Sequence, residues 1–399
     1  MGHPSHALRS SLLLLGILLV AANLRAALTA VGPILPLIAD DGIGPTKLGV
    51  LVALPVGAFA LVSPIVHRVA ARLGMERAVL LALVVLAAGT VVRSVFGEAG
   101  MWVGTAIVGS AIAVGNVLLP AVAKRDFPRR IPMVTAQYIA VQSVVAALAS
   151  GLSVPLARAW GAWNLSLAIW CVPVIFAAAV WLPRLKRPGL GDERGSASSV
   201  RQQPTSAGVS AGVWRQPGAW HVAVYFMIQS SVFYTLMNWM PTVEGDMGIS
   251  AAAAGWHLAL FLTISIAANF AVPGVIHHGG DQRLAAVGSA GLMVIAMAGM
   301  LAVPTLQLMW VALGGFSSGA SMVVSLSLIG LRAGSTAAAG QLSAMVQGIA
   351  YSGVAVTLVI DGFVRLVAGP GTHLLVLVLV LALLQLWSGF TAGRQRRPL

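Results

Sequence analysis

The chain has 399 residues, of which 58% are hydrophobic and only 9% are charged. Soluble domains carry about 25% charged residues, so this chain cannot cover itself with a water-soluble surface. A formal net charge of +13 and a mean hydropathy of +0.91 instead describe a basic protein whose main solvent is the bilayer. The single cysteine, Cys171, excludes an intrachain disulfide and a cysteine-based metal cluster. We expect no metal and no cofactor.

Apolar stretches of roughly 20 residues, separated by charges, glycine or proline, predict transmembrane helices. The short N-terminus runs into the first stretch without a small-residue cleavage site, which favours a first span over a removed signal peptide. We therefore predict an all-α membrane protein with twelve transmembrane helices. The predicted spans are Ser11–Ile38, Lys47–Val66, Ala78–Phe96, Met101–Ala123, Ile131–Leu156, Trp163–Leu182, Trp220–Val243, Ala251–Ile276, Leu284–Val303, Leu306–Leu331, Ala339–Leu366 and Thr372–Phe390.

One connection is much longer and more polar than the others. Residues 184–219 are rich in Gly, Ser, Gln and basic residues, which predicts a flexible cytoplasmic linker. The predicted domains are an N-terminal six-helix bundle at 1–183 and a C-terminal six-helix bundle at 220–399, the latter with a short basic tail. Gly49 and Arg77 match Gly255 and Arg283 at one constant offset. That match favours a duplication and two pseudo-symmetric bundles.

The distribution of Lys and Arg predicts that both termini are cytoplasmic. With that orientation, most basic residues fall at inside ends, and the ones at outside ends are Lys47, Arg93, Arg158 and Arg365. The excess of basic residues thus indicates the topology of the chain and provides contacts with anionic lipid. We expect no nucleic-acid partner.

Buried polar side chains are costly in lipid and tend to face a protein interior or water. The third, sixth, ninth and twelfth spans carry few such groups and are predicted to face lipid, while the other eight surround a central cavity. Helical spacing pairs a tyrosine with an amide on one face three times. The predicted substrate-binding residues are Arg25, Asn116, Tyr138, Gln142, Tyr234, Asn238, Gln347 and Tyr351. The alternative role for each is helix–helix hydrogen bonding.

Arg25 is the sharpest of these candidates. Insertion scales put the cost of a mid-helix arginine at about 2.5–3.5 kcal/mol, and its span has no acid to pair it. An anionic or nitro-bearing ligand is one candidate partner for the Arg25 guanidinium, and backbone carbonyls of a neighbouring helix are the alternative. Asn23 lies roughly 200° around the helix from Arg25, so we expect Asn23 to bond a neighbouring helix. Asn116 precedes Pro120 by one turn, and this proline frees a backbone carbonyl.

His257, near the outer end of its span, is a candidate for proton or ligand handling; the alternative is an interfacial histidine. The sequence has no metal-ligand spacing, no phosphate-binding loop with Lys and no paired acids in a span, which predicts neither an enzyme nor ATP-driven transport. No acid is expected at mid-depth. The acids assigned to positions at or near outside ends are Asp40, Asp41, Glu98, Glu244, Asp246 and Asp361.

Two stretches resemble the cyanate/2-nitroimidazole transporter family of the major facilitator superfamily. They are residues 23–33 (NLRAALTAVGP) and 113–120 (AVGNVLLP), the latter followed by 124–128 (KRDFP). The family pattern has proline where Ala26 stands. The superfamily's gating loop after the second span has an Asp that is missing from 71–74 (ARLG). We assign Arg72, Gly74 and Arg77 to this loop, without the usual inward latch.

The resemblance implies a secondary transporter in the plasma membrane, working by alternating access on a small anion or a small polar or nitro-heteroaromatic solute. We also expect a monomer, with a proton as a candidate coupling ion. The alternative is a drug/proton antiporter for larger organic compounds. Residues 151–155 (GLSVP) lack the Gly-Pro-x-x-Gly-Gly pattern that such exporters resemble. A non-transporting receptor is disfavoured because the linker and tails offer no signalling domain.

Overall fold

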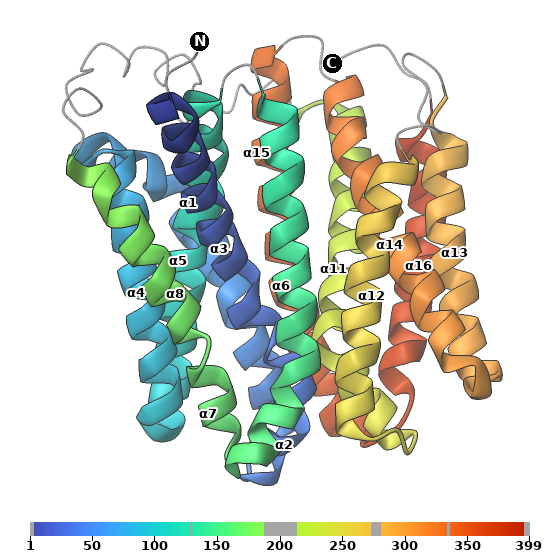
Figure 1. Ribbon diagram of the computed structural model, residues 1–399. Helices are drawn as coiled ribbons and strands as arrows, with labels where there is room; N and C mark the ends of the chain where they lie inside the picture. The colour runs from blue at the N-terminus through green and yellow to red at the C-terminus, as the bar shows by residue number, and fades with distance from the viewer. Residues whose placement is uncertain (1–3, 128–129, 187–213, 273–280, 333–335, 395–399) are drawn as a thin grey trace. The chain divides into compact units, whose positions relative to one another are not determined.

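The computed structural model describes residues 4–127, 130–186, 214–272, 281–332 and 336–394 (Figure 1). Within these ranges every regular element is a helix. Eleven described segments are long and apolar enough to cross a membrane. The helix α11 (Pro217–Asp246) is long enough, with 30 residues, but it is not among the eleven because its sequence is more polar. The eleven segments and α11 together correspond to the twelve predicted spans, which confirms the predicted fold class. The orientation of the termini stays a prediction.

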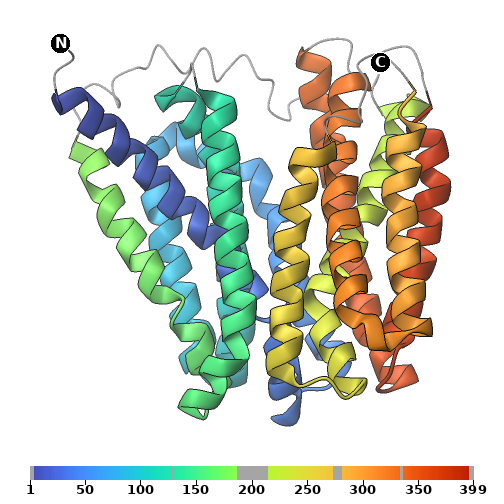
Figure 2. The same ribbon diagram turned by 45° about the vertical axis from the view of Figure 1, so that its right-hand side comes forward.

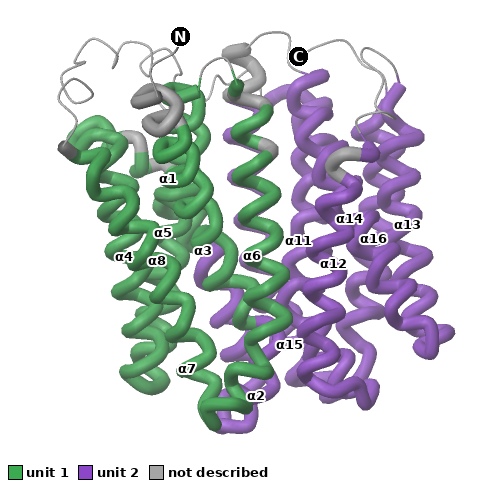
Figure 3. Tube along the Cα trace, in the orientation of Figure 1, with its two compact units in different colours: residues 1–31, 57–202 green, residues 32–56, 203–399 purple. Residues whose placement is uncertain are grey.

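The chain forms two compact units, each of which we describe by itself (Figure 3). Unit 1 comprises residues 1–31 and 57–202, and unit 2 comprises residues 32–56 and 203–399. The boundary near residue 56 falls inside α3 (Pro45–Leu73). The proposed bundle limits at 183 and 220 stay a prediction, and most of the predicted linker lies outside the described residues.

Unit 1 is built around the packing of α4 on α5 and of α1 on α6 and α5 (Figures 1 and 2). Its buried apolar core includes Ile17, Leu83, Val108 and Trp181. The elements of unit 1 are α1 (Pro4–Thr29), the second part of α3, α4 (Met75–Val95), α5 (Gly97–Asp126), α6 (Ile131–Trp160), α7 (Trp163–Ala168), α8 (Cys171–Trp181) and the 3₁₀ helix η2 (Leu182–Lys186).

The first predicted span is not one continuous helix. α1 ends at Thr29, and the chain continues through the 3₁₀ helix η1 (Gly32–Ile34) into α2 (Leu35–Asp40). Pro33 has no N–H and its ring clashes with the carbonyl four residues before, which stops an α-helix at this point. The buried Arg93 of α4 donates from Nη1 to the carbonyl of Ala27 at 2.9 Å. A cation at the last carbonyls of a helix stabilises that end.

The sixth predicted span is also interrupted. α7 ends at Ala168 and α8 begins at Cys171. Pro173 lacks the N–H that would bond to the carbonyl of Ile169, and Val172 N donates to that carbonyl instead, at 3.0 Å. The proline near the start of α8 therefore explains the break.

Unit 2 has a core that includes Tyr225, Phe226, Val324, Leu328 and Val346. Ser250 caps α12, accepting from Ala253 N at 3.3 Å. The elements of unit 2 are η1, α2, the first part of α3, α11, α12 (Ala251–Ala271), α13 (Arg283–Ala302), the 3₁₀ helix η4 (Pro304–Leu306), α14 (Gln307–Arg332), α15 (Thr336–Ala368) and α16 (His373–Ala392).

Two glycines let the 32–56 segment approach the long helices of unit 2 very closely. A Cβ at Gly32 would lie 2.5 Å from the carbonyl oxygen of Met237, which Pro241 leaves without its helical donor. A Cβ at Gly49 would lie 2.6 Å from the carbonyl oxygen of Leu358 and 2.8 Å from Cα of Gly362. Side chains cannot be placed at these contacts without displacing backbone. The segment is thus held in unit 2 by backbone-to-backbone packing.

Exposed apolar side chains follow helical spacing on α16 and α8. On α16 they include Val376, Val380, Leu383 and Trp387, which recur every three or four residues. Such a stripe needs an apolar solvent on its outer side. It supports the expectation that the twelfth predicted span faces lipid. On α8 the corresponding side chains are Val172, Ile175 and Phe176.

Candidate functional site

In unit 1, the polar residues of α1 differ in what they contact. Asn23 is 2% exposed, and its Nδ2 donates to the carbonyl of Leu19 at 2.8 Å and to that of Pro173 at 3.2 Å. This bond to α8 confirms that Asn23 bonds a neighbouring helix. Thr29 donates to the carbonyls of Arg25 and Ala146 at 3.2 and 3.0 Å, which ties α1 to α6. Arg25 itself is half-buried at mid-helix.

Asn116 on α5 differs from Asn23 in its surroundings. It is exposed, and no described residue hydrogen bonds with its side chain. The alternative reading of Asn116 as a helix–helix hydrogen-bonding residue therefore has no support within the described chain. One turn later, Pro120 leaves the carbonyl of Asn116 without its usual donor. The position offers an amide side chain and a backbone acceptor to a ligand or to water.

Tyr138 and Gln142 lie one turn apart on α6, as their spacing predicts. Tyr138 is half-buried against the unit 1 core, and its hydroxyl hydrogen bonds with the side chain of Thr135. Gln142 is 8% exposed. The tyrosine is thus partly engaged within its own helix, and the amide is covered.

The candidates of unit 2 are similarly held by local bonds. Asn238 is 3% exposed and donates from Nδ2 to the carbonyl of Tyr234 at 2.8 Å. The half-buried ring of Tyr234 packs edge-on to Phe233, with centroids 5.4 Å apart. On α15, Gln347 donates from Nε2 to Ser343 Oγ at 2.7 Å. Tyr351, one turn later, is half-buried.

His257 belongs to a buried polar cluster that the sequence did not predict. Its Nδ1 lies 3.0 Å from Oε2 of Glu244, whose side chain is fully buried at the end of α11. Gln307 at the start of α14 donates from Nε2 to Glu244 Oε1 at 2.7 Å. Glu244 therefore joins three helices of unit 2, and it is buried although it lies near the end of α11. His257 is thus a partner of this carboxylate.

Asp361 is a second buried acid of unit 2. It lies about two turns before α15 ends at Ala368, and its side chain is fully buried. Thr235 of α11 donates from Oγ1 to Asp361 Oδ2 at 2.7 Å. Asp361 Oδ1 has no hydrogen-bond partner among the described residues. The sequence places this acid near a helix end, and only the packing of α11 and α15 shows that it is enclosed.

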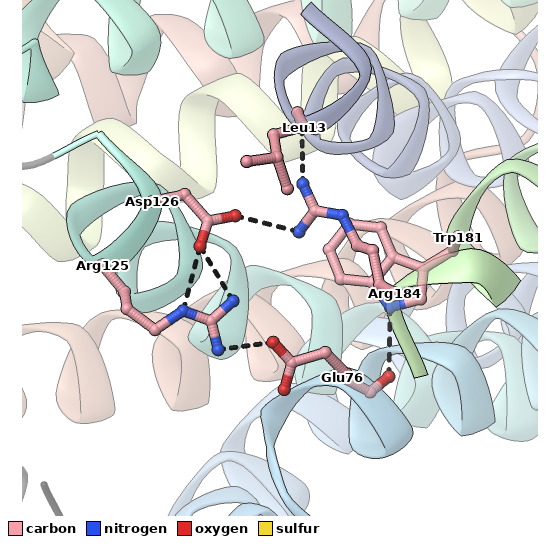
Figure 4. Close-up of polar contacts among 6 residues, drawn as sticks. All are labelled: Leu13, Glu76, Arg125, Asp126, Trp181 and Arg184. Atoms are coloured by element: carbon pink, nitrogen blue, oxygen red, sulfur yellow. Dashed lines mark hydrogen bonds and ion pairs between the residues drawn. The ribbon is translucent and has the colours of Figure 1, made fainter. Parts of the chain in front are cut away.

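An ionic network of unit 1 lies where α4 begins and α5 ends (Figure 4). Arg125 Nη1 pairs with Glu76 Oε1 at 2.5 Å, and Arg125 Nε donates to Asp126 Oδ1 at 2.9 Å. Arg184 Nη1 donates to Asp126 Oδ2 at 3.1 Å. Acids and bases alternate along this chain of contacts, so each buried charge has an opposite neighbour. We call Glu76, Arg125, Asp126 and Arg184 the ionic cluster.

The ionic cluster is also bonded to the helix backbone. Arg184 Nη2 donates to the carbonyl of Leu13 at 2.5 Å, and its guanidinium lies 4.0 Å from the ring centroid of Trp181. Trp181 in turn donates from Nε1 to the carbonyl of Glu76 at 3.1 Å. The cluster thus joins α1, α4, α5 and the end of α8 in one unit. It requires side chains from distant parts of the sequence, which is why sequence patterns did not reveal it.

The predicted gating-loop residues do not join this cluster. Arg72, Gly74 and Arg77 are all exposed, and Gly74 has φ +83° at the turn between α3 and α4. That conformation favours glycine. Glu76, which follows Gly74 by two residues, pairs instead with Arg125 of the ionic cluster.

Many helices apolar enough to cross a membrane, with buried polar and ionic contacts between them, define a multi-pass membrane protein. The family model described as Major Facilitator Superfamily matches residues 13–359. The chain belongs to this superfamily and is an integral multi-pass protein of the plasma membrane. Within the described residues, no group of three or more His, Cys, Asp or Glu side chains could hold a metal ion.

Relatives narrow the family further. The chain is 35% identical over 386 residues to the 2-nitroimidazole transporter of Escherichia coli (strain K12), covering 96% of each chain. It is 26% identical over 363 residues to the cyanate transport protein of the same organism, covering 90% of this chain and 91% of the relative. These matches confirm the family resemblance that was inferred from residues 23–33 and 113–120. A crystal structure of a D-xylose-proton symporter matches with TM-score 0.75 at 13% identity, over 97% of each chain; this likeness shows the fold alone.

Proposed function

We propose that this protein is a secondary active transporter of a small anion or a small polar or nitro-heteroaromatic solute, working by alternating access. The observation that carries the proposal concerns two polar residues of α1. Asn23 bonds α8, whereas Arg25 is a half-buried cation at mid-helix. The relatives named for 2-nitroimidazole and cyanate transport support this substrate class. We expect the transporting species to be a monomer.

The chemistry of Arg25 fits these solutes. A guanidinium presents planar N–H donors that match a nitro group or a small linear anion. Amides and tyrosines on the other helices supply donors and flat ring faces. The proposed solute contacts in unit 1 are Asn116, Tyr138 and Gln142, and those in unit 2 are Tyr234, Asn238, Gln347 and Tyr351. We also propose that the exposed turn of Arg72, Gly74 and Arg77 changes its contacts during gating.

Replacement of Arg25 tests the proposal. Arg25→Ala should reduce transport of 2-nitroimidazole and cyanate by roughly 10- to 100-fold, because a hydrogen bond to a charged group contributes about 1.5–3 kcal/mol. Arg25→Lys keeps the charge but not the planar fork, so it should retain part of the activity. Initial rates in proteoliposomes, normalised to protein content, give the measurement.

The matched control is Arg158→Ala, which removes an exposed arginine at the end of α6. It should transport like the unaltered protein. Equal transport by Arg25→Ala and by Arg158→Ala, at equal folding and insertion, would contradict a role for Arg25 in solute binding. Arg25 would then be a structural arginine.

A drug/proton antiporter for larger organic compounds is the second candidate. The buried acids Glu244 and Asp361 favour it, because an antiporter of this kind needs a group that binds a proton. Export of lipophilic dyes that stops when the pH gradient is collapsed, with no transport of 2-nitroimidazole or cyanate, would support the antiporter. Transport of the small solutes alone would exclude it.

A further inference from the structure

Asp361 is an acid that the proposed solute contacts leave unused. Its carboxyl group is fully buried inside unit 2. One oxygen, Oδ2, accepts a 2.7 Å hydrogen bond from Thr235, and the other, Oδ1, has no partner in the described parts of the chain. An ionised carboxylate with a bare oxygen in an apolar interior is strongly unfavourable, and such a group takes up a proton instead.

The charged groups of the surrounding helices do not neutralise Asp361. Arg365, one turn further along α15, pairs through both guanidinium nitrogens with Asp246 at the end of α11. Arg332 at the end of α14 donates to the carbonyls of Ala392 and Arg394. The remaining charged or titratable groups on the unit 2 elements packed against α15 are Lys47 on the first part of α3, His221, Tyr225, Tyr234 and Glu244 on α11, and His373 on α16.

No ion pair within the described ranges joins Asp361 to any of these groups. The cover over this part of α15 includes the backbone contact of Gly49 with Leu358 and Gly362. Water can therefore reach the carboxyl only if the packing around this stretch of α15 opens.

We propose that Asp361 is the binding site for a coupling proton, which deepens the proposed function and rests on it. In the enclosed state the proton forms an O–H bond at Oδ1, and Oδ2 remains the carbonyl oxygen that accepts from Thr235. When the helices around Asp361 separate and water enters, this bond breaks, the proton leaves to water, and the carboxylate is solvated. Opening and closing of the packing then load and release one proton per cycle.

Infrared spectroscopy of the purified protein in detergent tests the proton without any solute. The unaltered protein at neutral pH should show the carbonyl stretch of a protonated carboxylic acid, and Asp361→Asn should lose it. The control Asp281→Asn removes an exposed acid 3.6 Å from Arg283 and should keep the band. Thr235→Val keeps the acid and should move the band to higher frequency, because Oδ2 loses its donor. An unchanged band in Asp361→Asn, or no shift in a folded Thr235→Val, would overturn the proposal.

Transport in proteoliposomes separates this proposal from the proposed function. With 2-nitroimidazole as the probe, a pH gradient should drive accumulation by the unaltered protein. Asp361→Asn should still exchange labelled for unlabelled solute but should accumulate no more with the gradient than without it. Gradient-driven accumulation by Asp361→Asn would overturn the proton site and leave the transporter intact. A carboxylic acid band together with no transport of 2-nitroimidazole or cyanate would instead contradict the proposed function.

Discussion

Asp126→Ala is expected to destabilise unit 1 by about 3–5 kcal/mol, the usual cost of removing one partner from a buried ion pair. Asp126 is the shared acid of two arginines, accepting from Arg125 at 2.9 Å and from Arg184 at 3.1 Å. Arg184 is only 6% exposed, so its charge cannot turn to water without moving η2. The thermal unfolding temperature in detergent should fall, and so should the yield of folded protein.

The matched control is Asp281→Ala, which removes an acid from an exposed pair. Arg283 Nε and Asp281 Oδ2 are 3.6 Å apart, and both side chains are more than two-fifths exposed. Exposed ion pairs contribute about 0–1 kcal/mol to stability. If Asp126→Ala unfolds at the same temperature as Asp281→Ala, the ionic cluster does not stabilise unit 1. A double-mutant cycle between Glu76 and Arg125 would measure the coupling of the remaining pair.

Gly49→Ala is expected to destabilise unit 2. The new Cβ would lie 2.6 Å from the carbonyl oxygen of Leu358 and 2.8 Å from Cα of Gly362, and both of these atoms belong to the backbone. Overpacking of this kind costs about 1–3 kcal/mol, because rigid helices must move apart. Thermal unfolding should begin at a lower temperature, and transport should fall because the 32–56 segment no longer seats on α15.

Gly57→Ala, on the same helix, is the control for Gly49→Ala. No heavy atom lies within 4 Å of a Cβ at Gly57, and alanine is favoured over glycine inside a helix by roughly 1 kcal/mol. Gly57→Ala should therefore leave stability unchanged or raise it slightly. Equal stabilities for the two alanine variants would contradict the close packing of Gly49.

The sequence predicted the number, order and approximate limits of the helices, because apolar length alone decides which segments can cross a bilayer. It did not predict the breaks at Thr29 and Ala168. Pro33 and Pro173 are visible in the sequence, but a proline inside a membrane helix is compatible with a kink as well as with a break. The local hydrogen bonds decide between the two outcomes.

The candidate site was less predictable than the fold. The bond of Asn23 to α8 followed from its angular separation from Arg25, which is a property of one helix. Glu244 and Asp361 were assigned to positions at or near outside ends because position along a span was the only available guide. Their burial depends on which helices pack around them, and the ionic cluster likewise joins residues as far apart as Leu13 and Arg184. Such contacts between distant segments have no signal in one sequence.

Solute flux through the purified protein tests the central claim most directly. Proteoliposomes containing the protein should take up labelled 2-nitroimidazole or cyanate faster than protein-free vesicles. The rate should saturate with solute concentration, and Arg25→Ala should lower it while Arg158→Ala does not. Flux of both solutes equal to that of protein-free vesicles, from protein shown to be folded, would contradict transport of this substrate class.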